Sequence, residues 1–504
     1  MSDIVLATLN ARYIHTAFGL RYLYANLGED LKPRCEICEF TLENRPIDIA
    51  EQLLARKPKI IGVSVYIWNI VETTAVVAML KTIAPEVVIV LGGPEVTHES
   101  MEQEIVHLAN YVVKGQGEIS FRQLCGQLLN GMKPLEKLIE GVTSPLDQLV
   151  MPYNEYSDDD IAKRVVYVEA SRGCPFKCEF CLSALDKTAK PFELGVFLDE
   201  MQTLYERGLR HFKFVDRTFN LKVKNTITIL EFFLDKMDES ANELFLHFEL
   251  IPDHLPEKLK EAIQRFPAGT LQFEIGIQTF NPEVQSLISR RQDNQKSKDN
   301  VLWLRNETTA YLHTDLIFGL PGEDLESFAK SFNQLVALKP HEIQVGILKR
   351  LRGSPLIRHT EPFQLKFNPQ PPYNILSTDR VDFTTMQRIN RFARYWDMIG
   401  NSGRFTETLP MMLGDDPFYR FLAYSDAMFE RTRQTHKIAL KRLFELSYQI
   451  LTNELSADSN MVKEVLLNDF SNTKIRGRLI FPEDEVMIKS ESAGRRNQRQ
   501  VRHL

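Results

Sequence analysis

Apolar and amphipathic segments alternate along the first quarter of the chain. Short apolar runs typical of buried strands are separated by stretches whose apolar residues recur at helical spacing, such as 71–83 and 101–108. The apolar runs are 4–9, 36–40, 60–65, 87–91 and 111–113. Strands separated by helices predict a parallel sheet covered on both faces, so we expect an α/β domain with a doubly wound parallel sheet over residues 1–132.

A second series of strand and helix patterns begins at residue 165. Its strand-like runs are 165–170, 211–215, 244–249, 271–275, 311–317 and 342–348, and its helical stretches include 192–206, 223–236 and 325–338. Six such units predict a partial (βα)6 barrel of the TIM type over 165–365, with ligands at the C-terminal ends of the strands. Prolines and an acidic triplet make 133–164 a predicted linker.

The strand pattern stops near residue 370. Helical periodicity at 385–398, 417–433 and 437–453 predicts a mostly helical C-terminal domain over 366–490. A hairpin is expected at 478–488, and a basic tail occupies 491–504. Such a tail is more often solvated chain than an RNA anchor.

The composition of the 504 residues is that of an ordinary globular protein. The net charge of −6 gives no general attraction to nucleic acid or anionic lipid, although it does not exclude nucleic acid as a substrate. No apolar stretch reaches the ~20 residues of a membrane span, and the N-terminus lacks the pattern of a signal peptide. We therefore expect a cytoplasmic protein with no membrane partner.

Three of the six cysteines, Cys174, Cys178 and Cys181, lie within eight residues. In a reducing cytoplasm such a cluster indicates metal binding rather than disulfides, and thiolates suit zinc or iron–sulfur clusters. Structural zinc would require a fourth ligand, whereas three thiolates on a cubane cluster leave one iron open. The remaining cysteines are expected to be packing residues: Cys35, Cys38 and Cys125.

The pattern Cys174-x3-Cys178-x2-Cys181, directly after the first barrel strand, resembles the signature of the radical S-adenosylmethionine (SAM) superfamily. Phe180 stands at the aromatic position of that signature. The resemblance implies that the three cysteines hold a [4Fe–4S] cluster whose open iron binds SAM. It also implies reductive cleavage of SAM to a 5′-deoxyadenosyl radical.

Further segments resemble strand-end motifs of that superfamily in the same order. They are Phe212-x-Phe214-Val-Asp216, Phe248-Glu249-Leu, Glu274-Ile-Gly276-Ile-Gln278 and Asp315-Leu-Ile-Phe-Gly319-Leu-Pro-Gly322. Thr279 stands where serine is usual. The resemblance implies that SAM is contacted by Phe180, Asp216, Glu249, Gln278, Asp315 and Gly319. The catalytic residues stay unknown.

Loops at the strand ends of the first domain resemble the cobalamin-binding, Rossmann-like domains that precede some radical SAM barrels. The resemblance rests on a serine and a glycine pair after buried strands and on a Gly-Gln-Gly-Glu loop, and it implies cobalamin contacts by Ser64, Gly92, Gly93, Gly115, Gly117, Glu118 and His15. His15 lacks the Asp-x-His-x-x-Gly context of a cobalt ligand, and Tyr66 replaces the usual leucine after the serine. An ordinary tight turn at the glycine pair is the alternative.

Together these features predict a cobalamin-dependent radical SAM enzyme of a subgroup with an uncharacterised C-terminal extension. Its expected reaction transfers a methyl group to an unactivated carbon of an unknown substrate, with an external one-electron donor such as flavodoxin or ferredoxin. The alternatives are a cobalamin-independent radical SAM enzyme that modifies RNA or protein, and a non-catalytic Fe–S or corrinoid sensor. Because the two cofactor sites fall in separate domains, we expect them to behave nearly independently.

Overall fold

The computed structural model describes residues 2–239, 244–473, 475 and 477–481. They form two compact units. The first unit comprises 1–328, 338–341 and 346–383, and the second comprises 329–337, 342–345 and the residues from 384 onward. Most of the predicted hairpin at 478–488 and the whole basic tail lie outside the described residues.

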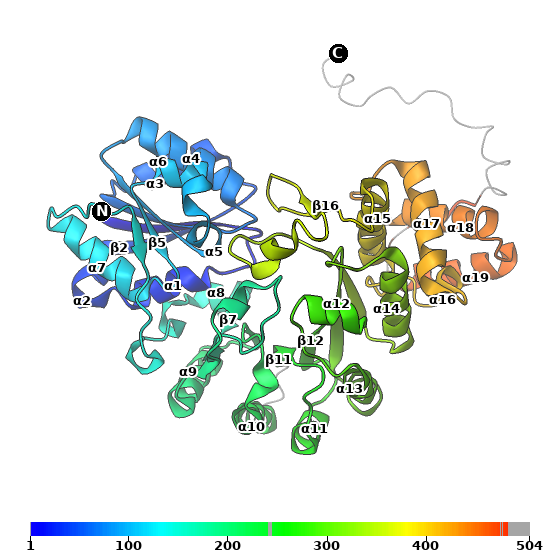
Figure 1. Cartoon of the computed structure of the whole chain (residues 1–504). Helices are drawn as coiled ribbons and strands as arrows, with labels where there is room; N and C mark the ends of the chain where they lie inside the picture. The colour runs from blue at the N-terminus through cyan, green and yellow to red at the C-terminus, as the bar shows by residue number, and fades with distance from the viewer. Residues whose placement is uncertain (1, 240–243, 474, 476, 482–504) are drawn as a thin grey trace, which may run out of the picture. The chain divides into compact units, whose positions relative to one another are not determined.

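The first domain is a six-stranded parallel sheet in the order β2-β1-β3-β4-β5-β6. Its strands are β1 (Ile4–Asn10), β2 (Cys35–Thr41), β3 (Ile60–Ser64), β4 (Val88–Gly92), β5 (Tyr111–Lys114) and β6 (Leu138–Glu140). Its helices are α1 (Phe18–Ala25), α2 (Gly28–Leu31), α3 (Pro46–Leu54), α4 (Ile70–Ile83), α5 (Pro94–Thr97), α6 (Glu104–Leu108) and α7 (Glu118–Leu129). Figure 1 shows α3, α4 and α6 on one face and α1, α2 and α7 on the other.

Each face of this sheet has its own apolar core, because side chains alternate along a strand. All seven residues of β1 are buried, as a central strand covered on both sides requires. Cys38 packs in the core under α3, α4 and α6, and Cys35 packs in the core on the opposite face with Cys125. The prediction that these three cysteines are packing residues is confirmed.

The segment 133–164, predicted as a linker, has defined structure. It contributes edge strand β6 and helix α8 (Asp158–Lys163), which begins with a capping box between Ser157 and Asp160. Tyr153 and Tyr156 are each only 1% exposed. The sequence pattern misses this because short strands and single helical turns have little periodicity to detect.

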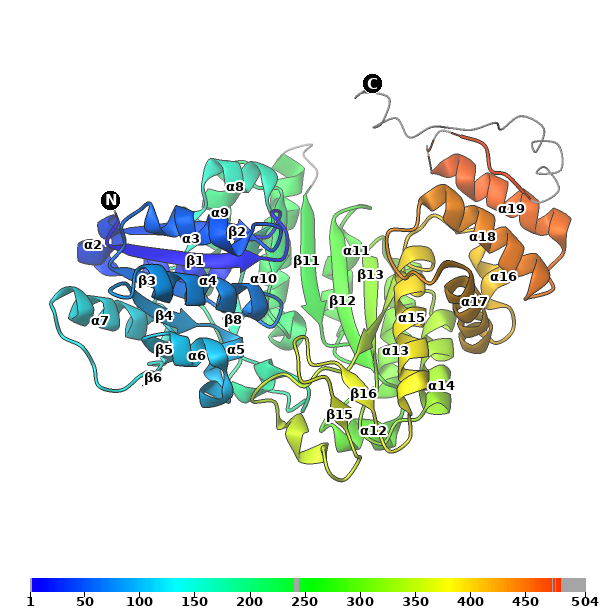
Figure 2. The same ribbon diagram turned by 90° about the horizontal axis from the view of Figure 1, so that it is seen from above.

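The barrel strands form a second six-stranded sheet in the order β14-β13-β12-β11-β10-β7. They are β7 (Val166–Val168), β10 (His211–Phe214), β11 (Phe245–Leu250), β12 (Leu271–Gln278), β13 (Tyr311–Phe318) and β14 (Glu342–Ile347). Figure 2 shows β11, β12 and β13 side by side. Along β12 and β13 every second residue is fully buried, so the intervening polar residues share the other face of the sheet.

Helices follow the barrel strands in the predicted alternation. They are α9 (Leu194–Glu206), α10 (Val223–Glu239), α11 (Glu257–Gln264), α12 (Pro282–Leu287), α13 (Asn294–Glu307) and α14 (Leu325–Ala337). Two short antiparallel pairs complete the region: β8 (Ser171–Arg172) with β9 (Lys190–Pro191), and β15 (Lys366–Phe367) with β16 (Ile375–Ser377). A parallel sheet of six strands and helices confirms the predicted partial barrel.

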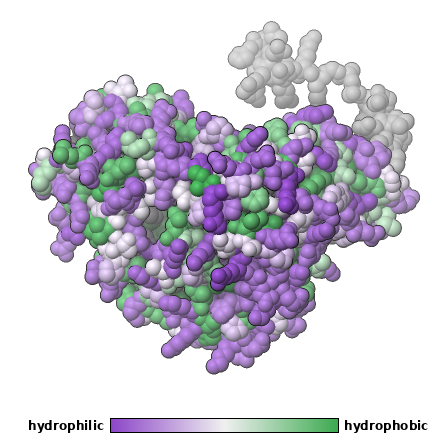
Figure 3. Space-filling model, viewed as in Figure 1, coloured by the Kyte–Doolittle hydropathy of each residue, from purple (hydrophilic) through white to green (hydrophobic). Residues whose placement is uncertain are grey.

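The second unit is mainly helical, as predicted. Its remaining helices are α15 (Phe383–Ile399), α16 (Leu409–Leu413), α17 (Pro417–Thr432), α18 (Leu440–Asn453) and α19 (Ser459–Asn472). Aromatic side chains pack in its core, where the ring of Phe332 meets those of Phe392, Trp396 and Phe418 edge to face. Among the described residues no helix has the length and apolar character needed to cross a membrane. The face in Figure 3 is mostly hydrophilic, with hydrophobic residues in small groups.

Candidate functional site

The three clustered cysteines lie on a loop that we call the cysteine loop (residues 171–191), whose base is closed by β8 and β9. Gly173 has φ +89°, and a Cβ there would lie 2.9 Å from the backbone nitrogen of Ala189. Only glycine fits that turn without strain. The backbone N–H of Cys174 donates to the carbonyl of Asp186 at 2.8 Å. Backbone contacts therefore fix the first cysteine in place.

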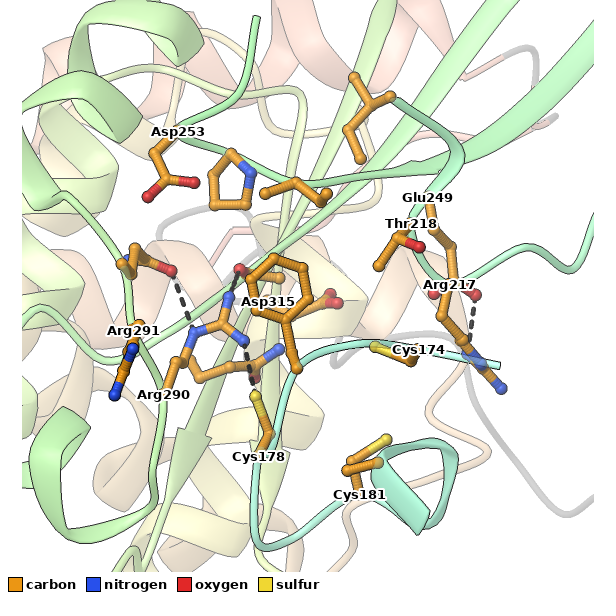
Figure 4. A pocket seen from close by; sticks show the side chains of 18 of the residues that line it. Cys174, Cys178, Cys181, Arg217, Thr218, Glu249, Asp253, Arg290, Arg291 and Asp315 are labelled. Carbon is orange, nitrogen blue, oxygen red and sulfur yellow. Dashed lines mark hydrogen bonds and ion pairs between the residues drawn. The ribbon is translucent and has the colours of Figure 1, made fainter. Parts of the chain in front are cut away.

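All three cysteines are free thiols on the wall of one cavity of about 240 Å³, which we call the cluster cavity (Figure 4). Burial raises the pKa of Cys174 and of Cys178. Arg290 Nη1 donates to Cys178 Sγ at 3.5 Å, and its positive charge opposes that rise. No group of three or more His, Cys, Asp or Glu side chains among the described residues is arranged to hold a single metal ion. The thiols instead surround a shared cavity, as a polynuclear cluster requires.

Gln278 at the end of β12 also lines this cavity, in a strained conformation. Its φ is +68°, and the pairing of β12 with β13 shifts register between Gly276 and Gln278. A Cβ on Gly276 would lie 2.5 Å from Gln278 Nε2, so the glycine makes room for the folded amide. Gln278 Oε1 is buried without a hydrogen-bond partner among the described residues. Strain and an unsatisfied polar atom at a cavity wall are typical of a ligand site.

Carboxyl groups from three neighbouring strands face the same cavity. Glu249 accepts from Arg217 at 2.7 Å, yet burial raises its pKa. Burial likewise raises the pKa of Asp315. His247 lies 3.2 Å from Glu274 and lowers the pKa of that carboxyl to about 2. Carboxylates and guanidinium groups on one wall can bind the amino and carboxylate groups of an amino-acid moiety.

Two predicted SAM contacts do not lie on the cavity wall. Asp216 is buried and accepts from the backbone N–H of Ala170 at 2.9 Å and from the Ser171 hydroxyl at 2.6 Å. Its side chain therefore supports the start of the cysteine loop. Gly319 has φ +93°, as a turn glycine does, and is not among the lining residues. A position at the end of a strand does not specify the course of the loop that follows it, so the sequence does not indicate where Asp216 and Gly319 lie.

A second cavity, of about 200 Å³, opens at the strand ends of the first domain, and we call it the slot. Six of the predicted cobalamin contacts line it: Ser64, Gly92, Gly93, Gly115, Gly117 and Glu118. The rest of the wall is largely apolar, with Leu20, Val63, Leu91 and Val113. Its position at the C-terminal edge of a parallel sheet is where ligands of such sheets bind.

The two adjacent glycines of the slot have different physical roles. A Cβ at Gly92 would meet only the Val113 carbonyl, at 3.7 Å, so this position leaves free space in the slot. A Cβ at Gly93, where φ is +104°, would lie 2.4 Å from the carbonyl oxygen of Val65. The backbone conformation therefore requires glycine at position 93, whereas glycine at position 92 keeps space open in the slot.

His15, the remaining predicted cobalamin contact, is not among the residues that line the slot. Its Nδ1 lies 2.7 Å from the hydroxyl of Tyr167, and its backbone bridges to Val165 beside β7. Burial, with nearby cations such as Lys213, lowers its pKa. These contacts give His15 a role in joining the first domain to the barrel.

Several residues at the two cavities escaped the sequence reasoning: Arg217, Arg290 and Arg291 at the thiols, and Tyr22 and Tyr66 at the slot. None of them belongs to a spaced motif of the kind that metal ligands form. In the sequence Tyr66 stands out only because the family has leucine at this position. Its hydroxyl lies 3.6 Å from the position of a Cβ at Gly19 of α1, and both residues line the slot.

Family models match three successive parts of the chain. The model described as B12 binding domain covers residues 4–125, and the radical SAM superfamily model covers 168–335. A model described as protein of unknown function (DUF4080) covers 361–496. The chain thus carries a B12-binding domain, a radical SAM domain and a DUF4080 domain in that order. The two resemblances inferred from the sequence are confirmed.

The match to each curated relative covers only part of that relative's length. An uncharacterized methyltransferase of Pyrococcus horikoshii is 27% identical over 306 residues, which is 55% of this chain and 64% of that protein. The cobalamin-dependent radical SAM methyltransferase TokK of Streptomyces tokunonensis is 22% identical over 67% of this chain and 54% of its own. The chain therefore spans a little over half to nearly two thirds of these relatives.

Solved structures of two proteins share the fold. TsrM of Kitasatospora setae, a radical SAM methyltransferase solved with cobalamin and a [4Fe–4S] cluster, matches with a TM-score of 0.57 and 17% identity over 71% of this chain and 74% of its own. OxsB, a cobalamin-dependent SAM radical enzyme solved with aqua-cobalamin and SAM, matches with a TM-score of 0.63 and 12% identity over 94% of this chain and 84% of its own. At these identities the likeness concerns the fold.

Proposed function

We propose that the protein is a cobalamin-dependent radical SAM enzyme that transfers a methyl group to an unactivated carbon of its substrate. The observation that carries the proposal is the presence, in one compact unit, of a cavity walled by three thiols and a glycine-lined slot at a sheet edge. The B12-binding and radical SAM domain matches support it. The match of the domain that holds the slot to the B12 binding domain model favours it over a cobalamin-independent enzyme.

Residues of the first cavity fit a [4Fe–4S] cluster with SAM on its open iron. Cys174, Cys178 and Cys181 are the soft ligands, and Arg290 stabilises the thiolate form of Cys178. The unsatisfied amide oxygen of Gln278 can accept a hydrogen bond from bound SAM. Glu249 with Arg217, and Asp315, provide further polar contacts on this wall.

Residues of the slot fit a flat apolar group that approaches backbone closely. Gly92 and Gly115 carry no side chain into the slot, and a Cβ at Gly115 would meet nothing within 4 Å. Ser64 supplies a hydroxyl at a strand end. When bound, the cluster would supply the electron that reduces the SAM sulfonium, and cobalamin would supply methyl-group transfer. The protein orients both cofactors and excludes water.

The proposal is tested by anaerobic reconstitution with iron, sulfide and hydroxocobalamin, followed by reduction and addition of SAM. We expect slow formation of 5′-deoxyadenosine even without substrate, and none from a protein lacking the three cysteines. An external donor such as flavodoxin or ferredoxin should replace the chemical reductant. A cluster-loaded, reduced protein that forms no deoxyadenosine would argue for a sensor or a structural cluster, and one that forms it but retains no corrinoid would argue for a cobalamin-independent enzyme.

A further inference from the structure

Arg172 connects the slot to the cysteine loop by direct contacts. Its Nη1 donates to Glu118 Oε1 at 2.7 Å, and its Nε donates to Glu169 Oε1 at 2.8 Å. Its guanidinium carbon lies 4.4 Å from the ring centroid of Tyr22. Glu118 and Tyr22 both line the slot. An arginine two residues before Cys174 is therefore held by two side chains of the other site.

These contacts are shielded from water. The side chain of Arg172 is 15% exposed, and those of Glu118 and Glu169 are 9% and 11% exposed. Charge-assisted hydrogen bonds at such positions are stronger than exposed ones, and loss of one partner leaves a buried charge uncompensated. Displacing one of the three side chains alone would therefore break a buried ion pair.

The chain between Arg172 and Cys174 has little freedom to absorb a movement of the arginine. Only Gly173 separates them, and its turn fits closely against Ala189. Arg172 is paired to Lys190 in the β8–β9 ladder, and the Cys174 N–H is bonded to the opposite side of the loop. The contacts that fix Cys174 in place thus act on the same short segment as Arg172, so a shift of the Arg172 backbone would be passed to the first thiol.

A third cavity, of about 510 Å³, lies against the same arginine. Its wall includes Gly115 and Gln116, which also line the slot, and Arg172, Asp186 and Lys190 of the cysteine loop. A ligand larger than the slot can extend from the slot into this cavity. There it would contact the first domain and the cysteine loop at once.

We propose that Arg172 is a positioning residue that couples the two sites, so that corrinoid bound in the slot tightens SAM binding at the cluster. A ligand in the slot packs against Tyr22 and Glu118 and favours the arrangement in which both hold Arg172. The inference rests on the proposed function, because it requires that both ligands bind. It replaces the expectation, made from separate domains, that the sites are nearly independent.

Two variants interrupt this connection without removing bulk. Arg172→Lys retains the positive charge but cannot make the two-pronged contact with both carboxylates. Glu118→Gln retains the size of the side chain, removes its charge on the slot side, and leaves the pair of Arg172 with Glu169 in place. If one variant fails to fold, as thermal unfolding of the cofactor-free protein would show, the other still tests the connection.

Arg352→Lys is a matched control. Arg352 is 16% exposed and joins the same two domains through Glu95 and Glu99, each at 3.1 Å. Its guanidinium also lies over a tyrosine ring, that of Tyr373, at 5.1 Å. It lines neither the cluster cavity nor the slot. Its substitution disturbs the domain junction to a comparable degree without touching the proposed connection.

The experiment measures the dissociation constant of SAM for cluster-loaded protein, under anaerobic conditions, with and without saturating hydroxocobalamin. In the wild type and in Arg352→Lys we expect corrinoid to tighten SAM binding by about fivefold or more, and SAM to tighten corrinoid binding by the same factor. In Arg172→Lys and Glu118→Gln the factor should fall below about twofold. The electron paramagnetic resonance spectrum of the reduced cluster should respond to corrinoid only where the coupling persists.

Two results would overturn the inference. One is a wild type that binds both ligands with a coupling factor near one. The other is an Arg172→Lys or Glu118→Gln protein that binds both ligands and keeps the wild-type factor. A wild type that retains no corrinoid at all would instead contradict the proposed function, and the coupling would be rejected with it. The two failures are thus distinguished by the corrinoid content of the wild type.

Discussion

The cluster cavity and the slot both open at the C-terminal ends of parallel strands, but the residues that line them differ in chemistry. Thiols, carboxyl groups and guanidinium groups line the cavity, whereas glycine and apolar side chains line most of the slot. The first site is defined by the side chains it has, and the second by the side chains it lacks. Removing functional groups should therefore disable the cavity, and adding atoms should disable the slot.

The largest effect is expected from the combined substitution Cys174→Ala, Cys178→Ala and Cys181→Ala. Without thiolate ligands the cluster absorbance expected at about 400 nm should be lost completely after reconstitution. Corrinoid retention should persist, because the slot does not use these residues. Cluster absorbance retained in this variant would place the iron elsewhere, and loss of both cofactors would show that the slot depends on the loop.

Filling the slot should have the opposite result. Gly92→Val places methyl groups in open space, so we expect corrinoid retention after desalting to fall by at least about tenfold with iron content unchanged. Gly93→Ala is the contrasting variant, because its Cβ would meet the Val65 backbone at 2.4 Å. It should lower the free energy of unfolding by roughly 1–3 kcal/mol whether or not corrinoid is present. Equal corrinoid content in Gly92→Val and wild type would move the site.

The electronic contribution of the cavity wall is tested by Arg290→Met. Arg290 donates to Cys178 Sγ, and hydrogen bonds to cluster sulfurs stabilise the reduced state. A bond worth about 1–2 kcal/mol corresponds to a lowering of the reduction potential by roughly 40–90 mV. A redox titration followed by electron paramagnetic resonance measures this shift. The Arg290 Nη2 also donates to the Gly276 carbonyl, and an unchanged or higher potential would leave the guanidinium with that structural contact alone.

The smallest effect is expected at Glu323, which is 1% exposed and bonded to Thr279, the residue after Gln278 of the cavity wall. Burial raises its pKa to about 8 from an ordinary 4.5, and Thr279 at the end of β12 donates to it at 2.7 Å. Because the folded state holds the proton more tightly, the associated stability is complete below about pH 4.5 and is lost as the pH rises toward 8. Glu323→Gln should remove that loss.

The measurement is the melting temperature of wild type and Glu323→Gln at pH 5 and pH 9. The melting temperature of Glu323→Gln minus that of the wild type should be larger at pH 9 than at pH 5 by at least about 2 °C. This corresponds to on the order of 1 kcal/mol. A difference between the two proteins that does not change with pH would show that Glu323 is ionised in the folded protein throughout this range.

The difference between the two sites also explains how much the sequence could predict. The fold was predicted nearly to its strand boundaries, because buried parallel strands leave apolar runs. The spacing of the three cysteines and of Gly276 and Gln278 is local, so those residues were identified as candidates and lie on one wall. The slot glycines were found as a set, but nothing in the sequence distinguished Gly92 from Gly93.

Contacts between distant segments were not predictable. Arg172 and Glu118 are 54 residues apart and belong to different domains, so no spacing connects them. The family resemblance predicts ligand contacts for Asp216 and His15; in the structure Asp216 accepts from the Ser171 hydroxyl, and His15 lies beside the Tyr167 hydroxyl. A strand-end position specifies an edge of the sheet, and only the folded loop determines which way a side chain points.

The central claim, that one chain holds both sites, is tested most directly by cofactor content. Wild-type protein is reconstituted anaerobically with iron, sulfide and hydroxocobalamin and desalted, and iron and corrinoid are quantified per chain. The account predicts about four iron atoms and one corrinoid in the wild type, iron alone in Gly92→Val, and corrinoid alone in the triple cysteine variant. Iron without corrinoid, or corrinoid without iron, in the wild type would contradict it.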